Sequence, residues 1–385
     1  MTDPFGGVVI AAAANSRQAK YFETETSLSL CIEATKLALD AAGISPDSID
    51  GVAGETGEET AYALGIGPTW GSRVGLGVRA VLESALAIRA GLCSTVLIVA
   101  GRAGTYRDHT STAPWTRRGT EFTATVGVFN AVEFALEARR HMHLYGTTAE
   151  QMSRAAATIR NNGHVNPEAV FYGKGPYTTD DVLASRMVSD PFRLLDCCIT
   201  SEGACAIVLT KADRTADLAL RPVRILGGGI DSLGPPHHNP PVWEQPMPSD
   251  GDAAGYVGRR AARLAFAMSG LGPADVDLCE LYDPFSFEII RQLEAFGFCG
   301  DGEGGQFVEE GNIEPGGRLP VNTDGGLLSY SHAGGSIQGT QRIVRAVHQL
   351  QRTCQSLQLP DAEVALASYG GSAVFFTDVI LLGRG

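Results

Sequence analysis

Cysteine and histidine are among the residue types that could carry nucleophilic or metal chemistry in this sequence. The chain has eight cysteines, and no two form a C-x-x-C pair, which argues against a zinc site of the ribbon or finger type. Cys197 and Cys198 are adjacent, but neighbouring cysteines rarely bridge and "LLDCC" is typical of a buried strand, so we favour a structural role. His237 and His238 lie in "GPPHHNPP" without a suitably spaced acidic or cysteine partner, which favours a surface loop over a metal site.

Two tyrosines stand beside other acid–base groups. Tyr282 precedes Asp283 in "LYDPF", and Tyr330 stands two residues before His332 in "SYSHAGG". A phenol, with a pKa near ~10, suits proton exchange with an alkoxide. From the residues alone, a tyrosine after a strand is more often a packing residue with a satisfied hydroxyl. Asp283 could orient a neighbour or cap the turn before Pro284.

Basic residues gather in and beside one segment of an otherwise acidic chain. Such a patch suits a ligand with several phosphate groups, although a solvated loop face explains any single one of these residues equally well. The glycine-rich "LGGGID" lacks the G-x-G-x-x-G pattern and a helix directly after it, so it is a weak candidate for a dinucleotide site. The basic residues are Arg102, Arg107, Arg117, Arg118, Arg139, Arg140 and Lys174.

The composition excludes several classes of protein. The 385 residues are 44% hydrophobic and 19% charged, which is too apolar for disorder. A net charge of −13 argues against nucleic acid as the main partner. No charged-then-apolar leader opens the chain, and no apolar run reaches the ~18 residues of a membrane span. We expect a cytoplasmic protein with reduced thiols and no membrane insertion.

The elements that position these residues alternate between strands and helices. In the first half, "GVVIAAAA" predicts a strand, and a helix follows Thr24 or Thr26 and ends at Gly43, with Leu28, Leu30, Ile32, Ala34, Leu37, Leu39 and Ala42 on its buried side. A second helix ends at Gly91 and is packed on two faces, and "STVLIVAG" is a buried strand that needs full cover. Residues 105–190 form a long insertion over a site, and "RLLDCCITSEGACAIVLT" returns to buried strand.

The second half repeats this order. A strand at "RPVRILGGGIDS" and a helix ending at Gly270 precede the strand "LCELYDPF", two helices and a closing pair of strands around a glycine turn. "GISPDSID" in the first half matches "GLGPADVD" in the second, which indicates an internal repeat. We therefore predict two similar α/β lobes, residues 1–215 and 216–385.

These segments resemble the thiolase superfamily over nearly the whole chain. The motifs that carry the resemblance are "AIRAG", "VLIVAG", "SEGACAIVL", "ELYDPFSFEIIRQLEAFGFC", "GGRLPVNTDGGLLSYSHAGG" and the final "GGSAV". The resemblance implies a thiolase fold with α-β-α-β-α layers. Within the superfamily the chain is similar to the lipid-transfer or sterol-carrier-protein branch. "HMHLYG", "YGKGPYTTDDVLASRMVSDPFRLLDCC" and "LYDPF" look most like the actinobacterial steroid side-chain aldolases.

The sequence departs from a true thiolase at its catalytic positions. By the family's spacing, Val74 stands where the nucleophilic cysteine belongs, and valine cannot attack a thioester. The second thiolase cysteine is replaced by Ser368 or Tyr369. Tyr282 occupies the Asn or His position of the next motif, and His332 preserves part of the Gly-His-Pro motif.

The resemblance therefore implies an acyl-CoA retro-aldolase rather than a thiolase. Tyr282 and Tyr330 would be base and acid, in an order that the sequence leaves open, and His332 would stabilise the thioester enolate. Asp283 could support them, and Tyr369 is assigned to packing. The products would be a ketone and a short acyl-CoA such as propionyl-CoA. Arg117, Arg118 and Lys174 are the candidates for the loop that holds coenzyme A.

The resemblance also bears on cofactors and partners. It implies a homodimer paired through a sheet edge, joined by a small OB-fold and zinc-ribbon protein into a heterotetramer. The chain itself would hold no cofactor and no metal, coenzyme A being part of the substrate. One alternative is a non-catalytic acyl-CoA or lipid carrier or structural subunit on a thiolase scaffold. A true thiolase using Cys197, Cys198 or Cys205 is disfavoured, since none stands at the right helix start.

Overall fold

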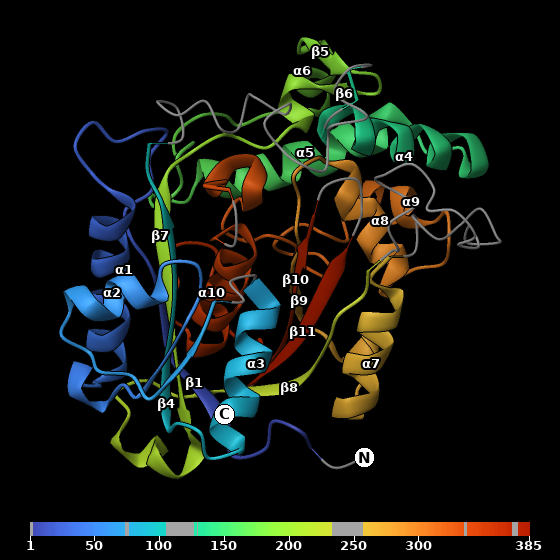
Figure 1. Ribbon diagram of the computed structural model, residues 1–385. Coiled ribbons are helices and arrows are strands. Elements are labelled where there is room, and N and C mark those ends of the chain that lie inside the picture. Colours follow the sequence, from blue (N-terminus) through green and yellow to red (C-terminus); the bar gives the residue numbers. More distant parts are fainter. Residues whose placement is uncertain are drawn as a thin grey trace, which may run out of the picture.

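A continuous nine-stranded mixed sheet forms the framework of the protein (Figure 1). The computed structural model describes residues 3–73, 77–104, 127–128, 130–232, 257–334, 337–371 and 376–385. In spatial order the strands are β3 (Trp70–Ser72), β2 (Gly51–Ala53), β4 (Thr95–Arg102), β7 (Gly203–Lys211), β1 (Val8–Asn15), β8 (Val223–Gly229), β11 (Thr377–Arg384), β10 (Val364–Gly370) and β9 (Leu278–Glu280).

The first five strands of this order come from the predicted first lobe and the last four from the second. β1 joins the two groups, because it pairs antiparallel with β7 on one side and, over two residues, with β8 on the other. The sheet therefore runs without a break across the predicted boundary after residue 215, and the division into two lobes stays a prediction.

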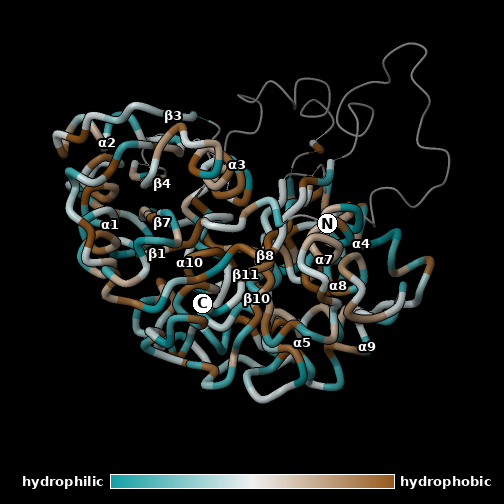
Figure 2. Tube along the Cα trace, turned by 90° about the horizontal axis from the view of Figure 1, so that it is seen from below, coloured by the Kyte–Doolittle hydropathy of each residue, from teal (hydrophilic) through white to brown (hydrophobic). Residues whose placement is uncertain are grey.

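Helices form three layers around this sheet. α1 (Ser27–Ala42) and α2 (Gly57–Ala63) lie outside the first group of strands, and α7 (Arg259–Ser269) and α8 (Phe287–Ala295) lie beyond the second (Figure 1). α3 (Gly77–Arg89) and α10 (Ile337–Gln351) lie between them and contact strands of both groups. Figure 2 shows hydrophobic residues running through the strands and α3. This is the α-β-α-β-α layering that the resemblance implied.

A cap of helices covers one end of the sheet. It comprises α4 (Asn130–Tyr145), α5 (Ala149–His164), α6 (Thr179–Ala184) and the hairpin of β5 (Met187–Ser189) and β6 (Phe192–Arg193), with α9 (Gly304–Glu309) beside it (Figure 1). α5 packs against α8, α9 and the turn at Gly326–Tyr330. The described part of the predicted insertion thus does cover the strand ends, with α4 and α5 as regular helices of 16 residues each.

The helix predicted after Thr24 or Thr26 illustrates what the pattern identified and what it missed. Thr26 is the N-cap, and Gly43 ends α1 in a left-handed conformation with φ 70°. However, Leu28 and Leu37 are 36% and 47% exposed, whereas smaller side chains face the sheet. The actual buried stripe keeps helical spacing, and it consists of Leu30, Cys31, Ala34, Thr35, Ala38, Leu39 and Ala42.

The strand predicted from residue 193 begins later, at Gly203. Residues Leu194–Asp196 form a 3₁₀ turn, and Cys197 makes only an isolated bridge to Phe285. The backbone here has other partners: buried Arg160 of α5 donates to the carbonyls of Leu195 and Cys197, at 2.7 and 2.8 Å, and the N–H groups of Cys198 and Ile199 donate to the carbonyls of Pro284 and Leu327. In the described residues no helix is long and apolar enough to cross a membrane.

Candidate active site

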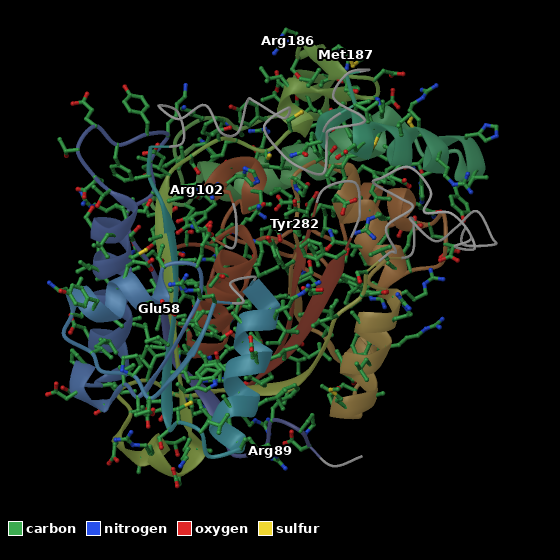
Figure 3. All side chains as sticks on the ribbon, in the orientation of Figure 1. Glu58, Arg89, Arg102, Arg186, Met187 and Tyr282 are labelled. Carbon is green, nitrogen blue, oxygen red and sulfur yellow. The ribbon has the colours of Figure 1, made fainter. Side chains whose placement is uncertain are left out.

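Tyr282 lies in the loop that leaves β9, below the cap (Figure 3). Its backbone N–H donates to Ser368 Oγ at 2.9 Å, and its carbonyl oxygen accepts from Gln292 Nε2 at 2.7 Å. β10 supplies Ser368, and α8 supplies Gln292. The backbone of Tyr282 is therefore fixed on one side by a strand remote in sequence and on the other by the next helix along the chain.

The side chain of Tyr282 is 6% exposed. Its ring meets the ring of Tyr369 edge to face, with 5.8 Å between centroids. Burial, reinforced by Tyr369, Cys198, Glu288 and Asp283, holds the pKa of Tyr282 well above the ordinary phenol value. The phenol therefore keeps its proton at neutral pH.

Asp283 connects this loop to the segment that carries Tyr330. Its Oδ1 accepts from the N–H of Leu327 at 2.8 Å, and its Oδ2 lies 3.4 Å from the N–H of Leu328. A Cβ at Gly326 would lie 2.1 Å from Oδ2, so only glycine permits this contact. Burial raises the pKa of Asp283 to about 7, against the opposing charge of Arg342. Asp283 thus caps the turn at Gly326–Tyr330.

Tyr330 ends that π-helical turn and is 2% exposed. Burial raises its pKa well above the usual range; Glu168 and Asp324 raise it further, and Arg342 and Arg345 lower it. These neighbours differ entirely from those of Tyr282. Among the described residues, the ring contacts of Tyr282 include Tyr369 but not Tyr330. The structure links the two predicted phenols through Asp283 and the backbone rather than through their rings.

His332 is half-buried and lies two residues beyond Tyr330. Its backbone is held by Ser201, which lies just before β7 in the sequence. Its N–H donates to Ser201 Oγ at 2.8 Å, and its carbonyl oxygen accepts from the Ser201 N–H at 3.3 Å. Ser201 Oγ lies 3.0 Å from Ser331 Oγ, which donates to Gln18 Oε1 at 2.7 Å. This chain of hydrogen bonds fixes the peptide of the histidine.

The cysteines in the described residues are poor nucleophiles. Burial raises the pKa of Cys197 to about 12 and those of Cys198 and Cys205 further. Val74 lies outside the described residues, so the structure does not place the position of the thiolase nucleophile. No group of three or more potential metal ligands occurs in the described ranges, and His237 and His238 lie outside them.

The predicted basic loop is only partly described. Arg107, Arg117 and Arg118 lie outside the described residues. Lys174 is exposed, with its ammonium 4.1 Å from the Phe171 ring centroid, and Arg139 forms a surface ion pair with Asp190. Arg102 ends β4 on the side of the sheet near the cap (Figure 3). A Cβ at Gly334, two residues after His332, would lie 3.1 Å from its Nη1, so Arg102 borders the candidate site.

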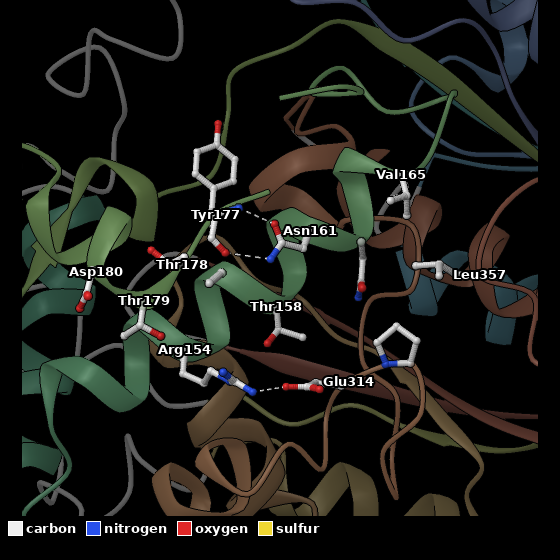
Figure 4. Close-up of a pocket in the computed structure, with 13 residues that line it drawn as sticks. Arg154, Thr158, Asn161, Val165, Tyr177, Thr178, Thr179, Asp180, Glu314 and Leu357 are labelled. Atoms are coloured by element: carbon white, nitrogen blue, oxygen red, sulfur yellow. Dashed lines mark hydrogen bonds and ion pairs between the residues drawn. The ribbon is translucent and has the colours of Figure 1, made fainter. Parts of the chain in front are cut away.

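A separate cavity of about 610 Å3 opens along α5 (Figure 4). Its polar wall includes Arg154, Thr158, Asn161 and Thr178. Arg154 is ion-paired with Glu314, and Asn161 is bonded to the backbone of Tyr177. None of its lining residues belongs to the loops that carry Tyr282, Tyr330 or His332. It is not part of this site.

Three supporting residues escaped the sequence analysis: Gln292, Ser201 and, in its supporting role, Ser368. Gln292 carried a usable signal, because an amide fully buried within "FEIIRQLEA" must satisfy its hydrogen bonds locally. Ser201 gave none, since its partners are distant in sequence.

Comparisons with known proteins agree on the family. Residues 242–384 match the model of the "Thiolase C-terminal domain-like" family. The chain is 37% identical to 17-hydroxy-3-oxo-4-pregnene-20-carboxyl-CoA lyase of Mycobacterium tuberculosis, over 85% of this chain and 87% of that protein. It is 33% identical to the steroid side-chain-cleaving aldolase of Thermomonospora curvata, over 83% and 86%.

The solved structures give the same result. The Ltp2-ChsH2(DUF35) aldolase superimposes with a TM-score of 0.83 and 30% identity, covering 98% of both chains. These likenesses favour catalysis over the carrier alternative. The protein belongs to the thiolase-fold family of steroid side-chain-cleaving aldolases.

Proposed function

We propose that the protein cleaves a bulky β-hydroxyacyl-CoA, with a steroid side chain as the acyl group, by a retro-aldol reaction. The products are a ketone and a short acyl-CoA such as propionyl-CoA. The observation that carries the proposal is the buried, protonated phenol of Tyr282, whose backbone is fixed on both sides and joined through Asp283 to the turn of Tyr330.

The reaction needs a base, an acid and an enolate stabiliser. The base removes the proton of the β-hydroxyl; the new C=O forms as the Cα–Cβ bond breaks, and the electron pair passes to the thioester enolate. The acid then protonates Cα, and a proton returned from the base to the acid restores the site.

The surroundings suggest which phenol does which step. Tyr369, Cys198, Glu288 and Asp283 all raise the pKa of Tyr282, which suits the acid that must hold its proton. At Tyr330, Arg342 and Arg345 oppose the larger upward effects of burial, Glu168 and Asp324 on the pKa, so we assign the base role to this phenol. His332 would donate to the enolate oxygen, where one well-placed donor contributes ~3–4 kcal/mol.

Replacing each tyrosine with phenylalanine tests the proposal. Tyr282→Phe and Tyr330→Phe keep the ring, so folding should change little, while turnover of a steroid side-chain CoA thioester should fall by ~10²–10⁴. The double variant should lose less than the product of the single losses, because both groups serve one sequence of proton transfers. Full activity in both single variants would favour the carrier interpretation instead.

Tyr369→Phe is the matched control, since Tyr369 is a buried phenol in ring contact with Tyr282. As a packing residue it should leave turnover near the wild-type value. A loss as large as that of Tyr282→Phe would make Tyr369, and not Tyr330, the second proton carrier.

Deuterated solvent separates the two roles. The acid variant should exchange the α-proton of the short acyl-CoA product more slowly than wild type. The base variant should exchange it normally and fail only in cleavage. The opposite result would reverse the assignment of Tyr282 and Tyr330.

The assembly is proposed as a homodimer that binds a small OB-fold and zinc-ribbon protein to form a heterotetramer. The similar solved structure is titled as a complex of Ltp2 with ChsH2(DUF35), which supports a partner. The strand Thr95–Arg102 does not itself require a second copy, because β2 and β7 flank it; the edge on that side of the described sheet is β3. Sedimentation that shows a monomer at micromolar concentration would contradict the dimer.

A further inference from the structure

Ser368, Gln292 and the peptide of Tyr282 form a closed ring of hydrogen bonds. The Tyr282 N–H donates to Ser368 Oγ at 2.9 Å, Ser368 Oγ donates to Gln292 Oε1 at 2.6 Å, and Gln292 Nε2 donates to the Tyr282 carbonyl at 2.7 Å. The second Gln292 donor contact goes to the carbonyl of Glu288, at 2.9 Å. Ser368 and Gln292 have no exposed surface.

The ring shows what Ser368 can and cannot do. A nucleophilic serine needs a base to take its proton, but the proton of Ser368 points at an amide oxygen, which is not a base. Its oxygen already accepts the Tyr282 N–H. The hydroxyl is therefore built to hold a peptide in place.

Ser368 is one of two side chains that hold this peptide, since Asn322 Nδ2 donates to its carbonyl, that of Leu281, at 3.0 Å. The flanking groups are fixed separately, the Leu281 N–H by the side chain of Asn322 and Asp283 by the turn at Gly326–Tyr330. Buried hydrogen bonds of this kind keep one geometry because an unpaired polar group costs about 1–3 kcal/mol. Without Ser368, the loop could settle with the phenol displaced by a fraction of an ångström.

We propose that Ser368 and Gln292 are positioning residues, which set the place of the Tyr282 hydroxyl in the retro-aldol site. This inference rests on the proposed function. A displacement of about 1 Å can cost ~10²-fold in rate when a reacting group is moved out of line. Ser368→Ala should accordingly lower kcat by about 10- to 100-fold and leave KM within about twofold.

A double-mutant cycle distinguishes positioning from general stability. If Ser368 acts only through the Tyr282 hydroxyl, Ser368→Ala should have no further effect on kcat in the Tyr282→Phe background. The inference is overturned if Ser368→Ala has wild-type kcat while Tyr282→Phe is slow, or if it lowers kcat equally in both backgrounds. Wild-type activity of Tyr282→Phe would instead refute the proposed function itself.

Two further variants complete the experiment. Gln292→Met opens the ring from the helix side and leaves the Ser368 contact to the Tyr282 N–H, so it tests the same inference should Ser368→Ala not fold; its kcat should also fall, and only when Tyr282 is present. Thr95→Val is the matched control. It removes a buried hydroxyl that lies 3.1 Å from Thr210 Oγ1, at the opposite end of β4 from Arg102, and it should keep wild-type kcat.

Discussion

Two buried regions adjoin each other in this protein and satisfy their polar groups in different ways. Around Tyr282 the ring of hydrogen bonds is neutral, and the neighbours that raise the pKa of the phenol are Tyr369, Cys198, Glu288 and Asp283. Around Arg342 the contacts involve charge: its guanidinium is ion-paired with Asp324 at 2.7 and 2.8 Å, and it donates at 3.1 Å to Glu280, whose pKa burial raises to about 8. Asp283 stands between the regions, with Arg342 and Tyr282 both within electrostatic reach.

The contrast shows why the site is built from phenols. Buried charges require close partners, which then fill the space around them. The Arg342 region meets that requirement, because Asp324 and Glu280 surround the guanidinium. The hydrogen bonds that hold the Tyr282 peptide join neutral groups, which need no ion-pair partner when buried.

The largest expected effect comes from breaking the charged region. Arg342→Met leaves Asp324 and Glu280 buried without their guanidinium, so unfolding free energy should fall by about 3–5 kcal/mol in urea titration. Arg73→Met, which removes an exposed ion pair with Glu58, is the control and should leave the unfolding midpoint unchanged. Equal stability of Arg342→Met and wild type would show that the contrast has no energetic basis.

A smaller effect should follow from Asp283, at the border. Its pKa rises from 3.8 to about 7 on folding, so between these pH values the folded state holds a proton that the unfolded state has lost. Stability therefore falls as pH rises through this window, by up to about 4 kcal/mol for this group.

Asp283→Asn should reduce the loss of stability between pH 5 and pH 8, measured by urea unfolding at each pH. Part of the loss should remain, because burial also raises the pKa of Glu280 to about 8. Asp181→Asn is the control, since the pKa of this exposed cap residue is lowered and it stays ionised throughout. An unchanged pH dependence in Asp283→Asn would place the titration elsewhere.

The smallest effect on turnover is expected from replacing Cys198, which is a neighbour of Tyr282. Because burial raises its pKa, mass spectrometry after incubation with acyl-CoA should find the protein unmodified. Cys198→Ala should retain turnover within a few-fold. An acyl adduct on any cysteine would restore the thiolase interpretation.

The sequence predicted the fold well, because its evidence is local. Thr26, Gly43, Gly91 and Gly270 mark helix ends by cap chemistry, and continuous apolar runs mark the buried strands. It was wrong about the start of β7, where the backbone before Gly203 binds residues distant in sequence, such as Arg160 and Leu327.

The roles of the site residues, unlike the fold, stay predictions. Tyr282, Tyr330 and His332 could be named from motif positions, and the support of Asp283 could be suspected. The ring through Ser368 and Gln292 could not, because its members lie in the loop after β9, on β10 and on α8, and only the folded chain brings them together.

The pairing of β1 with both β7 and β8 has a consequence for biosynthesis. The ribosome makes β1 first, but its partners, Gly203–Lys211 and Val223–Gly229, follow long afterwards. Until these partners emerge, the apolar segment of β1 is unpaired in the nascent chain, and unpaired strand edges promote aggregation. The sheet can close only when the middle of the protein has been translated, so this chain should depend on chaperones during synthesis more than a protein whose neighbouring strands are consecutive.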